Sequence, residues 1–265
     1  MRTNRRRRTH PVVRAIRRTL ALVVSAVALA TAAAGVVGAL SWARAHPYFA
    51  VREIEVEVDG KLDPKVVLGW ARLQTGMSVW DVSAREVERR LKAQPRIRDA
   101  AVERRLPNQV EVKIEERRAI AILLASEPLL VSDDGVPFPP LAGETAAGLP
   151  YVSGLAGKDL SAGPVVETLR RAARLIELWQ EHADWPELSE VRAEGEHLML
   201  HPQRTPMVIR FAAESGAGAE ELSRLAAVLE LWRGRESEVA AIDLSLPGQA
   251  LLRLRNPKTS AKTSI

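Results

Sequence analysis

The most constraining feature of the sequence is an uncharged stretch near its start, Thr19 to Ala43. As a helix with a rise of ~1.5 Å per residue, this stretch would be ~37 Å long, which exceeds the ~30 Å hydrocarbon core of a bilayer. A buried helix of a soluble protein rarely stays uncharged over such a length. The stretch therefore predicts a transmembrane helix over residues 19–43.

The residues before this stretch form a basic arm. Residues 1–18 contain eight arginines and no acidic residue, which favours a cytoplasmic location for this side of the span. We therefore expect residues 44–265 to be exported. This body carries 30 of the 38 basic residues and all 33 acidic residues, a net charge of −3, so it has no overall basic surface for nucleic acid.

A cleaved signal peptide is the alternative to a permanent anchor, because Ala43-Arg44-Ala45 has the A-x-A form of a cleavage site. The hydrophobic region of a signal peptide is only ~7–15 residues long, however, so we expect the stretch to remain as an anchor. The sequence contains no cysteine, which excludes disulfide bonds and thiol chemistry. The last ten residues, 256–265, are polar and predicted to be disordered.

The first part of the exported body predicts a small domain with the order strand, helix, helix, strand, strand. Apolar residues alternate with glutamates over residues 54–58, which is typical of a half-buried strand. Asp63-Pro64 and the capping box Ser83 to Glu86 mark two helix starts. Two further alternating runs, at residues 100–106 and 110–114, flank a Pro-Asn turn. We expect a three-stranded sheet covered on one face by two helices.

The sequences of these two alternating runs also resemble sequences of a known protein family. Their pattern is similar to the P-x-V-x-x-A-x-V-x-R-x-x-P and V-x-V-x-E-R motifs of the POTRA domain in FtsQ/DivIB division proteins. The matching residues are Pro95, Ile97, Ala100, Val102, Arg104, Pro107, Val110, Val112, Glu115 and Arg117. Ala119 stands where the family usually has a proline. The matching positions are core and turn positions, so they indicate a fold and not a site.

The second part of the body predicts a mixed domain with an antiparallel sheet and two helices. Apolar periodicity indicates helices over about 164–181 and 219–232. Short strands are expected around 120–125, 129–132, 189–193, 197–200 and 207–211, and a terminal hairpin over 239–246 and 250–254. The hairpin sequence resembles the closing V-D-L-R-Y motif of the same family, with Ser245 and Leu246 in place of Arg and Tyr.

The predicted fold class is therefore α+β. The predicted organisation is a basic arm (1–18), a transmembrane helix (19–43), a POTRA domain (47–117), an FtsQ-type β domain (118–255) and a disordered tail (256–265).

Three groups of residues invite a chemical interpretation, and each is better explained without one. His197 and His201 are four residues apart, which is the spacing of two metal ligands on a helix. They lie in an expected strand, however, where they would be ~13 Å apart. Asp133-Asp134-Gly135 is a turn signal. Glu115 and Glu116 are adjacent on a strand and point to opposite faces. We therefore expect no catalytic residue, metal or cofactor, and no enzymatic activity.

The family resemblance implies a function. It implies a single-pass scaffold of the bacterial division machinery, located in the inner membrane and enriched at the septum. Such proteins bind the single-span division proteins FtsB and FtsL and help to recruit or regulate septal peptidoglycan synthesis. An exposed sheet edge can recruit a partner strand, and in the family FtsB adds to the terminal strand. The partner-binding residues implied here are Ile242, Asp243, Leu244, Ser245, Leu246, Ala250, Leu251, Leu252, Arg253 and Leu254.

Two other classes remain open. A POTRA-bearing translocation or envelope assembly component would carry repeated POTRA domains or a β-barrel, and the sequence contains one POTRA pattern. An anchored envelope enzyme would need a convergent acid, metal or nucleophile set, which the sequence does not display.

Overall fold

The structure is a computed structural model that describes residues 11–212 and 219–255. Contacts divide the chain into two compact units, one formed by residues 1–91 and 100–114 and the other by residues 92–99 and 115–265. The predicted disordered tail and the first ten residues of the predicted basic arm lie outside the described residues.

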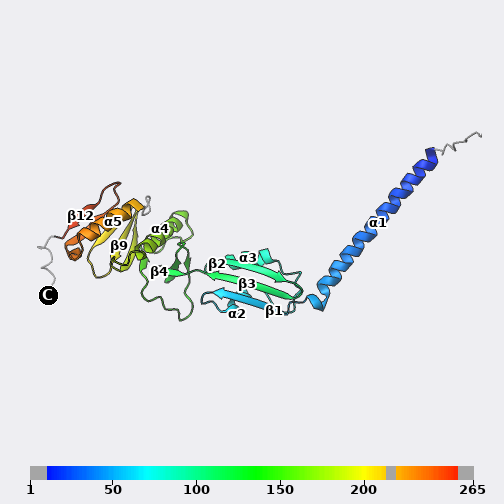
Figure 1. Ribbon diagram of the computed structural model, residues 1–265, viewed down its shortest axis with the longest axis horizontal. Coiled ribbons are helices and arrows are strands. Elements are labelled where there is room, and N and C mark those ends of the chain that lie inside the picture. Colours follow the sequence, from blue (N-terminus) through cyan, green and yellow to red (C-terminus); the bar gives the residue numbers. More distant parts are fainter. Residues whose placement is uncertain (1–10, 213–218, 256–265) are drawn as a thin grey trace, which may run out of the picture. The chain divides into compact units, whose positions relative to one another are not determined.

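The first unit begins with one long helix, α1 (Pro11–Ala45), drawn in blue in Figure 1. Its apolar part, Leu20–Trp42, has 23 residues and is long enough to cross a membrane, at ~35 Å. It is the one such candidate among the described helices. The helix starts eight residues before the predicted span, so residues 11–18 of the predicted arm are helical.

The rest of the first unit is built around a three-stranded sheet in the order β1-β3-β2. The predicted order of strand, helix, helix, strand, strand is confirmed. The elements are η1 (Pro47–Phe49), β1 (Glu53–Asp59), α2 (Pro64–Ala71), α3 (Ala84–Lys92), β2 (Ile97–Arg105) and β3 (Gln109–Glu116). Asp63 caps α2 as predicted, because its carboxylate accepts the Lys65 N–H at 2.8 Å. The buried side chains include Val67, Leu91 and Val112.

The second unit contains one nine-stranded sheet in the order β12-β11-β10-β9-β8-β7-β4-β5-β6. Its strands are β4 (Ala119–Leu123), β5 (Leu129–Ser132), β6 (Pro137–Phe138), β7 (Tyr151–Ser153), β8 (Leu188–Glu194), β9 (His197–Pro202), β10 (Val208–Ala212), β11 (Val239–Asp243) and β12 (Leu251–Leu254). The sheet is mixed, with parallel pairs at β4/β7, β7/β8 and β10/β11. The sequence predicted most of these strands but neither β7 nor the parallel pairs.

Two helices cover one face of this sheet, α4 (Gly163–Gln180) and α5 (Ala219–Leu231). Each helix joins two adjacent parallel strands, β7 to β8 and β10 to β11. Because β8 and β10 both run antiparallel to β9, the two parallel pairs have the same strand orientation. The strand order shows that both crossovers also move toward the β12 edge. Right-handed crossovers therefore place both helices on the same face, and both contribute to one hydrophobic core with the strands (Figure 1).

Candidate partner-binding edge

The predicted partner-binding residues lie in the β11–β12 hairpin at one edge of the nine-stranded sheet. Within it, β11 pairs with β10 on one side and with β12 on the other, so β12 is the outermost strand. The register pairs Ile242 with Leu252 and Asp243 with Leu251. Of the two strands, β12 is therefore the one that offers an edge to a partner.

The backbone N–H and C=O groups of successive β12 residues face alternately toward β11 and toward the open edge. The Arg255 N–H donates to the Glu238 carbonyl at 2.8 Å, so the backbone groups of Arg253 and Leu251 also face β11. Those of Leu252 and Leu254 then face outward. A partner strand would find donors and acceptors at these two residues.

The side chains of the hairpin are unusually apolar for an exposed position. All four residues of β12 are exposed, although alternate residues of a strand normally turn into a core. Among the described residues of the second unit, four of the seven large hydrophobic side chains that are exposed belong to this hairpin: Leu246, Leu251, Leu252 and Leu254. Exposed apolar side chains that gather in this way are typical of interaction surfaces.

Directly opposite residues of paired strands share a face of the sheet. Leu252 therefore lies on the same face as Ile242, which is buried in the helix-covered core. Leu251 lies on the opposite face with Asp243. A strand added to β12 would contact apolar side chains on both faces.

Two of the predicted residues are core residues. Ile242 and Leu244 are each only 1 % exposed, so they support β12 from behind and are not accessible to a partner. Ala250 is half-buried and packs against the same core. Among the predicted residues, the exposed ones are therefore Leu246 and residues 251–254, whereas Asp243, Ser245 and Ala250 are half-buried.

Asp243 and Ser245 hold the start of the hairpin loop. The Asp243 carboxylate accepts hydrogen bonds from the Ser245 N–H at 3.0 Å and the Ser245 hydroxyl at 2.6 Å. Arg210 of β10 lies 3.4 Å from its other oxygen. Burial works to raise the pKa of Asp243, but the bonds from Ser245 and the charges of Arg210 and His197 hold that pKa below its ordinary value. Asp243 therefore stays ionised and fixes the chain leaving β11.

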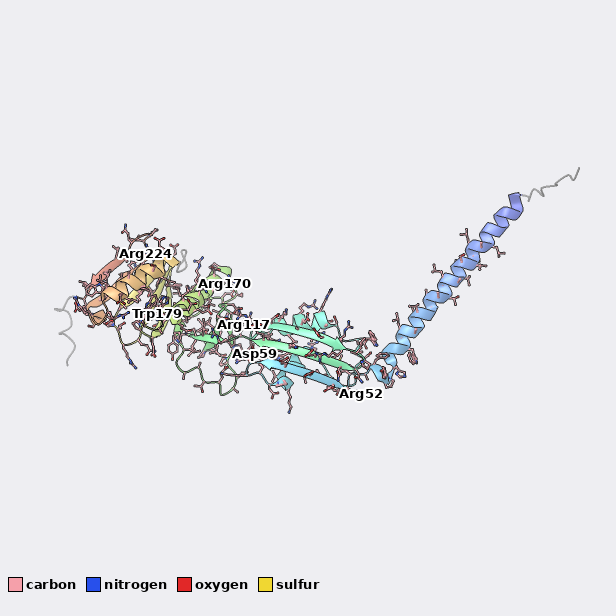
Figure 2. The ribbon with its side chains drawn as sticks, viewed as in Figure 1. Arg52, Asp59, Arg117, Arg170, Trp179 and Arg224 are labelled. Atoms are coloured by element: carbon pink, nitrogen blue, oxygen red, sulfur yellow. The ribbon has the colours of Figure 1, made fainter. Side chains whose placement is uncertain are left out.

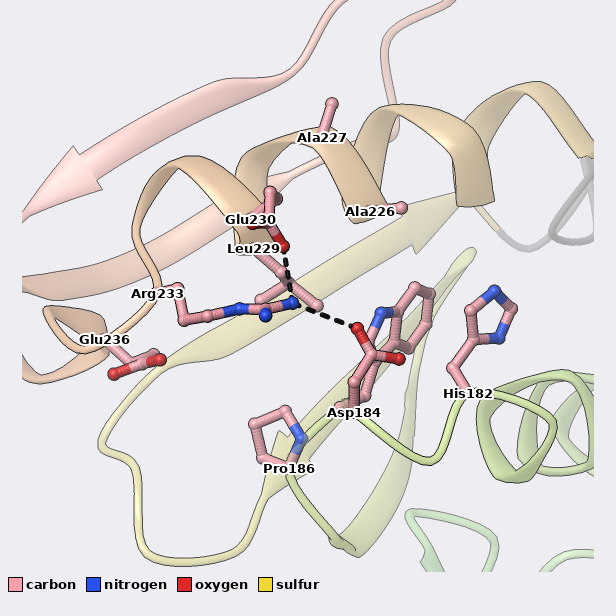
Figure 3. A pocket seen from close by; sticks show the side chains of 10 residues that line it. His182, Asp184, Pro186, Ala226, Ala227, Leu229, Glu230, Arg233 and Glu236 are labelled. Carbon is pink, nitrogen blue, oxygen red and sulfur yellow. Dashed lines mark hydrogen bonds and ion pairs between the residues drawn. The ribbon is translucent and has the colours of Figure 1, made fainter.

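A separate cavity of about 340 Å³ lies between α5 and the loop that follows α4 (Figure 3). The His182 ring stacks on Trp185 with 4.1 Å between centroids, and its Nδ1 lies 2.9 Å from the Leu178 carbonyl oxygen. Arg233 pairs with Asp184 at 3.2 Å and with Glu230. One arginine therefore faces two carboxylates, and its ion pair with Asp184 links the chain after α5 to the loop after α4.

The other residues with a possible chemical role are also engaged structurally. Asp133 pairs with Arg98 at 2.5 Å, and Asp134 accepts bonds from Arg117 at 3.2 Å. His197 and His201 lie near opposite ends of β9, opposite Glu194 and Glu190. Among the described residues, no group of three or more metal-ligating side chains could hold an ion.

One important residue was not singled out from the sequence. Arg96 is buried and bonds Glu116 at 2.5 Å, Glu144 at 2.9 Å and the Pro139 carbonyl at 3.1 Å. Its guanidinium also lies 5.2 Å from the centre of the Phe138 ring. In sequence it stands in a run rich in charged residues, so it resembles a surface arginine. The adjacent Pro95 was the one local signal of a constrained position.

Together, the one candidate membrane-spanning helix among the described residues, a β-α-α-β-β domain and a sheet that ends in an exposed apolar strand are the features of a POTRA protein with an apolar N-terminal helix. The family model of the FtsQ-type POTRA domain matches residues 49–117. The chain is 26 % identical over 221 residues to the cell division protein FtsQ of Myxococcus fulvus, covering 82 % of this chain and 78 % of that protein. It is 23 % identical over 211 residues to FtsQ of Geotalea daltonii, covering 78 % and 76 %.

A shorter match, 32 % identical over 75 residues, relates the chain to the cell division protein DivIB of Geobacillus kaustophilus and covers 28 % of this chain and 29 % of that protein. The chain thus carries an FtsQ-type POTRA domain and is similar over most of its length to FtsQ cell division proteins. This similarity supports a role as a division scaffold.

Proposed function

We propose that this protein is a non-enzymatic, single-pass scaffold that binds an FtsB-like partner by adding one of the partner's strands to β12. An FtsL-like protein would join the same complex. Through it the scaffold helps to recruit or regulate septal peptidoglycan synthesis. The observation that carries the proposal is the outermost strand β12, whose side chains are all exposed.

The location follows from the same proposal. The basic arm stays in the cytoplasm, α1 spans the inner membrane, and the residues after α1 lie in the periplasm, enriched at the division septum. The eight arginines before the span support this orientation. The relatives named above are all division proteins, which supports this function over the translocation alternative.

The test is co-purification of the full chain in detergent with an FtsB-like and an FtsL-like protein of the same organism, for the wild type and Leu252→Pro. The proline removes an outward-facing donor and places its ring in the path of a partner strand. We expect the affinity to fall by more than about tenfold, because proline removes a backbone hydrogen bond in addition to the leucine side chain. The ladder to β11 should survive, because Arg253 and Leu251 make the bonds to β11.

The matched control is Leu252→Ala, which shortens the same side chain and keeps its N–H. Circular dichroism establishes that each variant is folded. A larger loss for proline than for alanine supports backbone pairing at this residue. Equal affinity of wild type and Leu252→Pro would contradict strand addition at β12 and move the site elsewhere on the chain.

A further inference from the structure

Exposed apolar side chains also gather at one end of the first unit. Outside α1, the described residues of this unit expose four large hydrophobic side chains: Tyr48 (55 %), Val66 (42 %), Trp80 (39 %) and Leu106 (58 %). They come from distant parts of the sequence. Three of them, Tyr48, Trp80 and Leu106, are brought to the same end by the fold.

Backbone hydrogen bonds show how these residues meet. The Val79 N–H donates to the Phe49 carbonyl and the Val51 N–H to the Met77 carbonyl, both at 2.8 Å. The Arg52 N–H donates to the Asn108 carbonyl at 2.9 Å. The loop before α3 and the turn between β2 and β3 are thus both fastened to residues 49–52.

The aromatic rings pack at this junction. Phe49 lies 5.5 Å from Trp80 and 5.2 Å from Tyr48, measured between ring centroids. Phe49 itself is half-buried, whereas Tyr48 and Trp80 are exposed. The ring of Phe49 therefore supports two amphipathic aromatic side chains at the surface.

This end of the unit directly follows the apolar helix. The span ends at Trp42, and seven residues later the chain reaches Phe49, a path of at most ~25 Å even if fully extended. The other end of the sheet lies ten residues further along the chain, at Asp59, the last residue of β1. Figure 2 shows Arg52 and Asp59 at the two ends of β1. Val66, near the start of α2, belongs to the far end.

We propose that Tyr48, Trp80 and Leu106 insert into the headgroup layer of the membrane that α1 crosses, so that the lipid bilayer is the partner of this surface. Tyr and Trp favour this layer because their rings are apolar and their N–H or O–H groups can meet water or headgroups. Leu106 adds apolar area beside them. The contact ties this end of the POTRA domain to the bilayer and limits its tilting about the end of the span.

This inference rests on the membrane span and on the fold of the first unit, and not on strand addition at β12. Its failure would therefore leave the proposed partner edge untouched. The contact also needs no second protein, so vesicles that contain only lipid are a sufficient test. A protein partner for the same surface would give a different result, because the side chains would then remain in water in such vesicles.

The experiment uses the full chain in vesicles of phosphatidylethanolamine and phosphatidylglycerol. Because the protein has no cysteine, Asp81→Cys and Lys65→Cys each give one site for an environment-sensitive fluorophore. Asp81 is exposed and adjacent to Trp80, whereas Lys65 is exposed at the far end. We expect blue-shifted emission and quenching by a headgroup-labelled nitroxide lipid at residue 81 but not at residue 65. Identical behaviour at the two sites would overturn the proposal.

A second pair of variants tests the named side chains. In the Asp81→Cys background, Trp80→Ser with Leu106→Ser should abolish the blue shift and the quenching. The matched control Val66→Ser removes an equally exposed apolar side chain at the far end and should leave both signals unchanged. Circular dichroism establishes that the variants are folded. Quenching that persists in the folded double variant would show that these side chains do not make the contact.

Discussion

The two edges of the nine-stranded sheet end in opposite ways. At one edge, β12 presents a row of exposed side chains that includes three leucines. At the other, β6 has only two residues and is followed by two prolines, so that Phe138 is the only residue of 137–140 with a backbone N–H. Phe138 is itself already paired with Leu130 of β5. The edge at β6 therefore offers no row of donors to an incoming strand.

Buried charge completes the protection of this second edge. Arg96, Glu116 and Glu144 have side chains only 6 %, 5 % and 8 % exposed, and Arg96 also bonds the carbonyl of Pro139 just beyond β6. Edge strands are normally shielded because bare ones aggregate. Among the described residues, the edge at β6 is closed by prolines and buried charge, whereas β12 is covered by no further strand and carries one charged residue, Arg253. The contrast supports the proposed binding of a partner at β12.

The largest effect is expected from Arg96→Ala at the closed edge. The substitution removes the cation that pairs with the buried side chains of Glu116 and Glu144, which should cost about 3–5 kcal/mol of unfolding free energy. Chemical denaturation of the full chain in detergent, followed by tryptophan fluorescence, measures the loss. Arg98→Ala is the matched control, because its pairs with Asp133 and Glu115 are more exposed and contribute about 0–1 kcal/mol.

If the two edges have separate roles, the folded Arg96→Ala protein should bind its partner with wild-type affinity. A similar loss of stability in both variants would show that the buried network does not hold the closed edge. A loss of affinity in the folded Arg96→Ala variant would show that the two edges are coupled.

The next largest effect concerns the open edge. Leu252 lies on the helix-covered face next to the core, so a partner strand would complete its burial. We expect Leu252→Ala to weaken partner binding about tenfold, which is about 1.4 kcal/mol. Leu251→Ala, on the opposite face, should weaken it less. Titration of the labelled partner with each variant measures the difference. A greater loss for Leu251 would place the partner's contacts on the other face of the sheet.

The sequence predicted the open edge better than the closed one, for a physical reason. The alternation of apolar and polar residues over 239–254 and the Pro-Gly turn are local signals, and they are sufficient to predict a hairpin. They do not reveal which strand is outermost, because that depends on the parallel pairing of β11 with β10. Residues 242–246 were thus predicted to be part of the edge, whereas Ile242 and Leu244 are buried behind it.

The closed edge depends on contacts that no local pattern encodes. The network joins Arg96, Glu116 and Glu144, which are up to 48 residues apart in the sequence. In a chain so rich in charges, three buried charged residues are indistinguishable from surface ones until the fold brings them together. The three residues of β7 are likewise too few for a period of two to be recognised.

A smaller effect is expected where the open hairpin leaves β11. Asp243→Ala removes the acceptor of the Ser245 N–H and hydroxyl, which should reduce the local stability of the hairpin by about 1 kcal/mol. Hydrogen exchange of the amides in β12 measures the change. Asp243→Asn keeps an acceptor and should fall between the wild type and alanine. Unchanged exchange in Asp243→Ala would show that Ser245 is not needed to order the loop.

The smallest effect is a dependence of the same hairpin on pH. Because the pKa of Asp243 in the folded protein is lower than in the unfolded chain, its contribution to stability is complete above the unfolded value of about 3.9. The contribution is lost as the pH falls through the lower, folded value. Amide protection in β12, corrected for intrinsic exchange rates, should therefore decline below about pH 4 in the wild type, and less steeply in Asp243→Asn, which cannot titrate. If the two proteins lose amide protection in parallel as the pH falls, other carboxylates cause the decline. A difference in protection between the two proteins that is confined to β12 would show that Asp243 stabilises the open edge and not the closed edge.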